Sequence, residues 1–243
     1  MSAFFFGPPE RQLFGYHHVP RGTPTGAAVL CPPWAREYQY AHRAFHFLAK
    51  RLAARGCHVL RFDYSGTGDS WGASTEANTE RWAEDIALAV GELRTMSGLE
   101  HVDLVGLRVG AFLAAQATTD IPGVRSIVLW DPIMEGEAWL RELGVAGAVD
   151  GGRLEVGGTI VSRTFVDQIR AIRPETYEAA RIERVLFLLT QGDDEGDGFD
   201  SSPHLPGVER VWLQQPAPWL EDPSIWAGQV PVEAVRRIVE WLS

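Results

Sequence analysis

The sequence has few cysteines and no long hydrophobic run. Its two cysteines, Cys31 and Cys57, form no pattern of paired spacings, so we expect reduced thiols rather than a disulfide framework. No apolar run approaches the roughly 18 residues that a membrane helix needs. Residues 3–6 are too short for a signal peptide and have no basic residue before them. These absences predict a protein of the cytoplasm.

Basic residues are also scarce. Lys and Arg number 22 against 32 Asp and Glu, a net charge of −10 at pH 7, so the surface as a whole repels phosphate backbones and anionic lipids. We therefore expect neither nucleic acid nor a membrane as a partner, and the sequence leaves a homodimer open. The 243 residues are 45% hydrophobic, enough for the core of one domain over residues 1–243.

Short β-branched runs alternate with longer segments of helical periodicity. Strands predicted at residues 27–30 and 58–62 flank a helix whose apolar face includes Phe45, Leu48 and Leu52. The alternation continues with strands at 102–105, 126–130, 185–189 and 208–213, and with helices around Trp82, over 111–117 and over 232–242. Repeated βα units predict an α/β fold with a mostly parallel central sheet and helices on both faces.

The alternation stops between about residues 132 and 174. Trp139 begins an apolar helical stripe, residues 150–152 (Asp-Gly-Gly) form a predicted turn between two short strands, and Ser162 is suited to cap a further helix. We interpret this segment as a small lid inserted over the carboxyl edge of the sheet, where open α/β folds bind ligands. The alternative is a plain connecting segment.

The segment Gly106-Leu107-Arg108-Val109-Gly110 follows an apolar strand and opens a helix. This is the context of the G-x-S-x-G nucleophile elbow, in which two glycines flank a strained turn and the central side chain projects over the sheet edge. Here the central residue is Arg108 instead of serine.

Several motifs carry a resemblance to a known family. CPPW at 31–34 and RFDYSGTGDS at 61–70 precede the elbow, and WDP at 130–132 follows it. With these motifs the chain resembles the α/β-hydrolase superfamily, in particular its serine-aminopeptidase-like (S33) branch. Within that branch it is similar to exosortase-associated and biosynthetic-cluster hydrolases that carry arginine at the elbow. The resemblance implies an α/β-hydrolase fold and an accessory biosynthetic role.

The same resemblance implies a degenerate catalytic triad. Arg108 takes the place of the nucleophile, yet a guanidinium stays protonated and has no lone pair for attack. The family's general base is a histidine after the last strand, but no histidine follows His204, which precedes that strand. The acid corresponds to Asp193 or Asp194, or to Asp131 one strand earlier. Serine-type acyl transfer is therefore excluded at this position.

The electrostatic part of such a site does not depend on the missing side chains. The backbone N–H of Val109, with that of Trp34 or Ala35, would form the oxyanion hole. Arg108 lies at the first turn of a helix, which already favours an anion. We predict a site for a carboxylate or a phosphate, such as that of a phosphopantetheine or coenzyme A arm.

An alternative is that Arg108 pairs internally with Asp131, Asp193 or Asp194 and fills the old pocket, because a buried guanidinium needs such partners. His42, near Glu37 in the first helix, is a further candidate for an acid or base.

Three tryptophans fall on the predicted site. Trp34, Trp130 and Trp139 lie on the pocket loop, a strand end and the lid, which suits an apolar or acyl ligand.

We predict neither a metal nor a cofactor, since the acidic run at 193–200 lacks the terminal glutamate of a calcium loop.

Three functional hypotheses follow from these residues. In the first, the protein binds an acylated, anionic small molecule or a carrier-linked acyl group by a serine-free route. In the second, it hydrolyses an ester, thioester or amide with water activated by an aspartate or by His42, while Arg108 stabilises the oxyanion. In the third, it is a non-catalytic scaffold. Under the first hypothesis, replacing Arg108 with alanine is expected to abolish ligand binding and to leave the fold intact.

Overall fold

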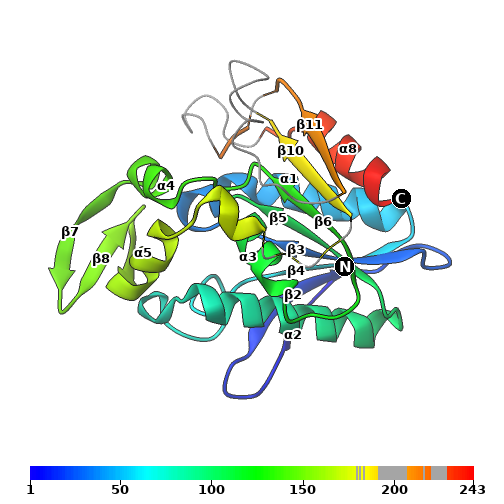
Figure 1. The fold of residues 1–243 in the computed structure, drawn as a ribbon. Coiled ribbons are helices and arrows are strands. Elements are labelled where there is room, and N and C mark those ends of the chain that lie inside the picture. The colour runs from blue at the N-terminus through cyan, green and yellow to red at the C-terminus, as the bar shows by residue number, and fades with distance from the viewer. Residues whose placement is uncertain (179, 181, 183, 191–206, 216, 220–228) are drawn as a thin grey trace.

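A mostly parallel sheet forms the centre of the computed structural model, which describes residues 1–178, 180, 182, 184–190, 207–215, 217–219 and 229–243 (Figure 1). The strand order is β1-β2-β4-β3-β5-β6-β10-β11, and only the β1–β2 and β2–β4 pairs in it are antiparallel. The strands are β1 (Ser2–Phe6), β2 (Leu13–His18), β3 (Gly26–Cys31), β4 (Cys57–Phe62), β5 (Val102–Leu107), β6 (Val124–Trp130), β10 (Val185–Leu189) and β11 (Val208–Trp212).

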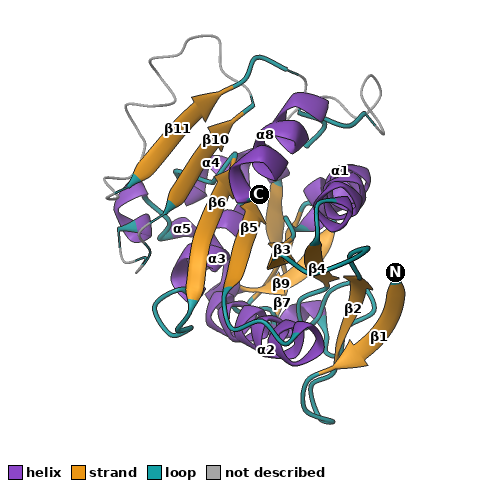
Figure 2. Ribbon diagram, turned by 90° about the vertical axis from the view of Figure 1, so that its right-hand side faces the viewer, coloured by secondary structure: helices purple, strands orange, loops and turns teal. Residues whose placement is uncertain are grey.

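Helices cover both faces of this sheet (Figure 2). One face packs against α1 (Ala35–Ala54) and α8 (Val232–Leu242), and the other packs against α2 (Thr79–Ser97) and α3 (Val109–Ala117). Strands β4 and β5 are buried along their whole length, as expected for parallel strands covered on two sides. The predicted α/β architecture is confirmed, and the predicted elements occur within one or two residues of their expected bounds.

The segment that interrupts the alternation forms a small unit of its own. It consists of α4 (Gly136–Leu143), a three-stranded antiparallel sheet of β7 (Val145–Asp150), β8 (Arg153–Val156) and β9 (Thr159–Ser162), and α5 (Arg163–Arg170). The predicted turn at 150–152 joins β7 to β8, and the Ser162 hydroxyl accepts a hydrogen bond from the Phe165 N–H at 3.1 Å. Strand β9 was not predicted; it follows a Gly157-Gly158 turn that lets the chain reverse a second time.

This inserted segment lies at the carboxyl ends of the central strands. Trp139 contacts Glu37, which follows β3, and the Ser74 hydroxyl in the short 3-10 helix η1 (Ser74–Glu76), which follows β4, donates to the Ile160 carbonyl at 2.8 Å. Beyond α5, a second 3-10 helix, η2 (Pro174–Tyr177), leads back toward β10. The segment therefore stands beside the edge where open α/β sheets place their ligands.

The N-terminus of α2 is capped by Asn78. Its side-chain oxygen accepts hydrogen bonds from the backbone N–H groups of Glu80 at 2.8 Å and Arg81 at 3.3 Å. We expect Asn78→Ala to lower the free energy of unfolding by about 1 kcal/mol, the usual loss for an N-cap. Asn78→Asp keeps the acceptor and should unfold like the wild type in urea. Equal stability of all three proteins would show that the cap contributes nothing.

Among the helices that the structure describes, none has both the length and the apolar character needed to span a bilayer.

Candidate functional site

The turn between β5 and α3 holds Arg108 in the conformation of an elbow residue. Its φ is 56° and its ψ is −122°, a region that non-glycine residues rarely occupy and that is typical of functional turns. The Arg108 N–H donates to the Trp130 carbonyl at 3.0 Å, which ties the turn to the end of β6. The arginine therefore occupies the strained position at which the resemblance places a nucleophile.

At the two glycines that flank the elbow there is no room for a side chain. A Cβ on Gly106 would overlap the backbone of Ala111, and a Cβ on Gly110 would overlap the carbonyls of Cys31 and Pro32. The first turn of α3 thus lies directly against the loop that follows β3. This close approach brings the Val109 N–H next to the loop that carries Trp34 and Ala35.

The Arg108 side chain is buried and ion-paired. Nε lies 2.9 Å from Glu37 Oε1, and Nη2 lies 3.0 Å from Glu142 Oε2. Nη1 also donates to the Asp131 carbonyl at 3.4 Å. Burial alone would lower the pKa of Arg108, but the two carboxylates raise it above its usual value. The guanidinium therefore stays charged at every relevant pH.

These partners differ from those that the sequence left open. The Asp131 carboxylate does not pair with Arg108, because it is turned toward β10, and Asp193 and Asp194 lie outside the described residues. The sequence places Glu37 downstream of CPPW and near His42 at the predicted pocket but does not indicate that it pairs with Arg108, and it gives no reason to single out Glu142. The glutamate three residues after CPPW was the one signal in the sequence for a partner of Arg108. The position of α4 over α1, which brings Glu142 to Arg108, cannot be read from the sequence.

The two carboxylates bound by Arg108 differ in environment. The Glu37 side chain is 3% exposed, whereas that of Glu142 is 58% exposed. Glu37 Oε1 also accepts a hydrogen bond from the Trp139 indole N–H at 2.9 Å, and Oε2 is buried with no partner among the described residues. Burial raises the pKa of Glu37, and Arg108 opposes this. The Nε side of the guanidinium is therefore held by the buried Glu37 carboxylate, and the Nη2 side is held by the solvent-exposed Glu142 carboxylate.

The Asp131 carboxylate links the end of β6 to the end of β10 through hydrogen bonds. Its φ is 41°, and its carboxylate accepts hydrogen bonds from the Thr190 N–H at 2.7 Å, the Thr190 hydroxyl and the Trp219 indole N–H at 3.0 Å. Burial raises the pKa of Asp131, while these donors lower it. Since both oxygens already accept hydrogen bonds, the carboxylate is not placed to take a proton from water.

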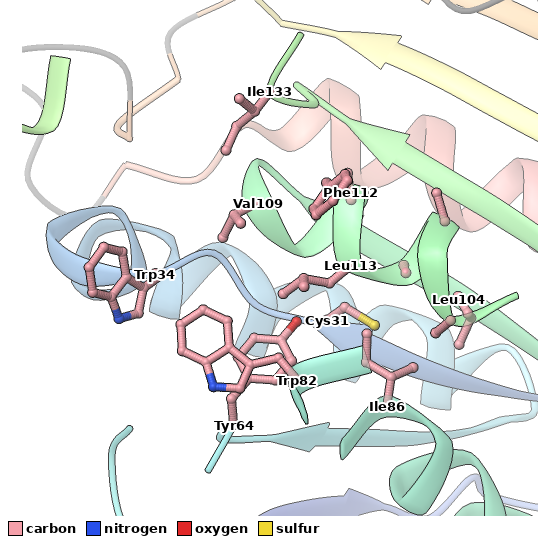
Figure 3. Packing of buried hydrophobic residues seen from close by; sticks show 14 of the residues in the cluster. Cys31, Trp34, Tyr64, Trp82, Ile86, Leu104, Val109, Phe112, Leu113 and Ile133 are labelled. Carbon is pink, nitrogen blue, oxygen red and sulfur yellow. The ribbon is translucent and has the colours of Figure 1, made fainter. Parts of the chain in front are cut away.

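An aromatic cluster stands beside the elbow (Figure 3). The Trp34 ring lies 6.2 Å from Trp139 and 5.0 Å from Phe165, centroid to centroid, so the pocket loop packs on α4 and α5. Ala35 begins α1 with a φ of 53°. The structure thus brings Trp34, Ala35 and Trp139 to the same edge as Arg108 and Val109.

Two predicted site residues lie elsewhere. The Trp130 ring points to the opposite face of the sheet, where it stacks on Phe45 at 6.5 Å and meets Trp219 edge-on at 5.0 Å. His42 lies within α1, beside Tyr38 and Arg61. Trp130 is directed away from Arg108 because successive strand residues alternate between the faces of the sheet. His42 lines a cavity that Arg108 does not line.

A cavity of about 220 Å³ opens next to this edge. Trp34, Ala35 and Tyr38 line it from the start of α1, residues 66–68 from the loop after β4, and Thr159 from the inserted segment. Apolar and aromatic walls with a few hydroxyl groups are typical of small-molecule sites. In the part of the chain that the structure describes, no group of three or more His, Cys, Asp or Glu residues could hold a metal ion.

Residues 37–149 match the family described as "Serine aminopeptidase, S33", a span just under half of the chain. No functionally curated protein matches the sequence.

Solved structures of similar fold include three hydrolase-like proteins. Est1E from Butyrivibrio proteoclasticus, solved with ferulic acid, is 15% identical, with 99% of this chain and 96% of that chain covered and a TM-score of 0.69. Alpha/beta hydrolase domain-containing protein 10 from mouse is 17% identical, with full coverage of both chains and a TM-score of 0.66. An alpha-beta serine hydrolase homologue from Coxiella burnetii is 16% identical, with coverages of 100% and 97% and a TM-score of 0.64. At these identities the likeness establishes the fold alone.

Proposed function

We propose that this chain, which has the α/β-hydrolase fold and matches the S33 serine aminopeptidase family over residues 37–149, is a serine-free member of the α/β-hydrolase superfamily that binds an acylated, anionic small molecule or a carrier-linked acyl group. Its setting is the cytoplasm and its role is accessory to a biosynthetic reaction. The observation that carries the proposal is the ion-paired arginine at the elbow, in the position from which a serine would attack.

The environment of Arg108 suits recognition of an anion. Glu37 fixes the guanidinium from a buried position, whereas the pairing with Glu142 is exposed and contributes at most about 1 kcal/mol. A ligand carboxylate or phosphate can therefore replace Glu142 at little cost, while Glu37 keeps the arginine in place. In this account the Glu142 carboxylate occupies, in the unliganded protein, the place beside Arg108 that the ligand anion takes when it binds.

The acyl part of the ligand has a place in the 220 Å³ cavity that Trp34 and Ala35 line, although Arg108 itself does not line it. Its walls include Trp34, Tyr38 and Tyr64, which offer apolar contact area. Backbone N–H groups of Val109 and Ala35 would bind the carbonyl oxygen of the acyl group without performing chemistry on it. Trp139 acts on the site through Glu37 and is a positioning residue.

We expect octanoate to bind to the wild-type protein at least tenfold more tightly than octanamide, which has the same chain without the charge. A hydrogen bond to a charged group contributes about 1.5–3 kcal/mol, and this range corresponds to tenfold or more. In the double variant Arg108→Met/Glu37→Gln the preference should disappear, while octanamide binds as before. Isothermal titration calorimetry measures all four affinities, and equal binding of acid and amide to the wild type would contradict anion recognition.

The two other hypotheses predict different results with the same protein. A non-catalytic scaffold is favoured by the internal pairing of Arg108 with two glutamates, and it predicts binding of neither octanoate nor octanamide. A hydrolase predicts turnover of octanoyl esters or thioesters above buffer. Among the described residues, the Asp131 carboxylate already accepts three hydrogen bonds, and His42 lines a cavity that Arg108 does not line, so neither is placed to activate water beside Arg108.

A further inference from the structure

A second cationic site lies on the face of the sheet covered by α1, where that helix passes β4 and β2 (Figure 2). Its inner cavity, of about 470 Å³, is lined by His42, Arg43, His46 and Arg61 with aromatic neighbours. An adjoining cavity of about 650 Å³ shares His46 and adds His18, Arg21 and Lys50. We call these two cavities the Arg61 groove. It is distinct from the elbow, and its argument does not rest on the proposed function.

Arg61 is a buried cation without an anionic partner. The residue is 8% exposed, and among the described residues no carboxylate lies within ion-pair distance of its guanidinium. Its Nε donates to His18 Nε2 at 3.3 Å, and its guanidinium lies 5.1 Å from the centroid of the Tyr16 ring. Arg108, the other deeply buried arginine in the part of the chain that the structure describes, has two carboxylates. Asp63 attracts Arg61 from beyond ion-pair distance, so this buried charge is only partly compensated by the described residues.

The acidic group next to the groove is already engaged. Asp63 lies at the inner end, where its carboxylate accepts hydrogen bonds from the Tyr38 hydroxyl at 2.5 Å and from the Asp69 N–H at 3.2 Å. It does not line either cavity of the groove. In a chain of net charge −10, a lining of seven basic or imidazole side chains without a carboxylate among the described residues marks a local reversal of charge.

The Arg61 charge disfavours protonation of the imidazoles in the groove. Burial and then the nearby Arg61 charge lower the pKa of His42 and His46, and the same two causes lower the pKa of His18 to about 4. An anion between these groups would remove the repulsion and let the imidazoles take up protons. The groove is therefore arranged for a ligand that carries more than one negative charge.

We propose that the Arg61 groove binds the phosphate group of a small phosphate ester. The Arg61 guanidinium is suited to contact two phosphate oxygens, and Arg43 and His46 add donors from α1. Tyr16, Phe47 and Val230 line the same cavity and give the organic part of an ester an apolar wall. Free inorganic phosphate would use the same donors but not this wall.

The experiment compares phenyl phosphate with inorganic phosphate on the full chain by isothermal titration calorimetry at pH 7.5. We expect phenyl phosphate to bind at least tenfold more tightly than inorganic phosphate. Arg43→Gln and His46→Gln should each weaken phenyl phosphate several-fold, and Arg61→Gln should weaken it more than tenfold. Arg55→Gln, the same charge change at the exposed end of α1 outside both cavities, should change nothing.

The exposed Arg43 keeps the test decisive if Arg61→Gln fails to fold. Unchanged affinity in Arg43→Gln and His46→Gln, or equal affinities for phenyl phosphate and inorganic phosphate, would overturn the proposal. Sulfate adds a second readout because it keeps its double charge between pH 6 and pH 8. Its binding should be several-fold tighter at pH 6, where His42 and His46 are more easily protonated, and binding independent of pH would also contradict the account.

Discussion

Replacing Arg108 with alanine should lower the free energy of unfolding by about 3–5 kcal/mol, the usual loss when one partner of a buried ion pair is removed. The reason is Glu37, whose carboxylate is 3% exposed and would stay behind with only the Trp139 indole as a donor. This expectation differs from the one drawn from the sequence, that Arg108→Ala leaves the fold intact, because the structure pairs Arg108 with a buried carboxylate. Urea denaturation monitored by tryptophan fluorescence measures the loss.

Two matched variants separate the ion pair from a general effect of losing an arginine. Arg141→Ala, an exposed arginine on α4, should change the free energy of unfolding by less than about 0.5 kcal/mol. Arg108→Met/Glu37→Gln removes both charges and keeps an acceptor for Trp139, so it should recover most of the stability. A double variant as unstable as Arg108→Ala would show that the unpaired carboxylate is not the cause.

Gly110→Ala should destabilise the protein by about 3 kcal/mol, at the upper end of the range for overpacking. The added methyl group would overlap the Cys31 and Pro32 carbonyls, and backbone atoms of a buried strand end have little freedom to move. Because the same displacement would push the loop away from α3, Trp34 and Ala35 should lose their position relative to Val109. Octanoate binding should fall together with stability.

Gly91→Ala is the control for this substitution. Gly91 lies within α2, and a Cβ there meets no atom within 4 Å, so alanine should stabilise the protein by about 0.5–1 kcal/mol through its higher helix propensity. Thermal unfolding of the two variants should therefore shift in opposite directions. If Gly110→Ala unfolds like the wild type, the close packing of the elbow against the pocket loop is not needed for stability.

Much of the fold could be predicted because it depends on local patterns. The strand at 185–189 is a continuous apolar run, and the glycines of the elbow mark a turn whose tightness the structure confirms. Strand β9 escaped prediction because four residues after a Gly-Gly turn carry little periodicity. Local sequence does not show that such a segment pairs with β8.

The partners of Arg108 could not be predicted because they depend on how distant segments pack. Glu142 reaches the elbow only because α4 lies over the start of α1, and Asp131 turns away only because Thr190 and Trp219 offer it donors. Trp130 was expected at the pocket, but its place in the strand directs it to the other face. The fold followed from patterns along the chain, whereas the chemistry of the site follows from contacts between its parts.

The central claim is that Arg108 recognises an anion for which Glu142 substitutes in the unliganded protein. Titration of Glu142→Gln with octanoate tests it most directly, with Glu137→Gln on the same helix as the control. If Glu142 competes with the ligand, removing its charge should tighten octanoate binding up to about fivefold, equivalent to about 1 kcal/mol, and the control should bind like the wild type. Unchanged or weaker binding by Glu142→Gln would contradict the account.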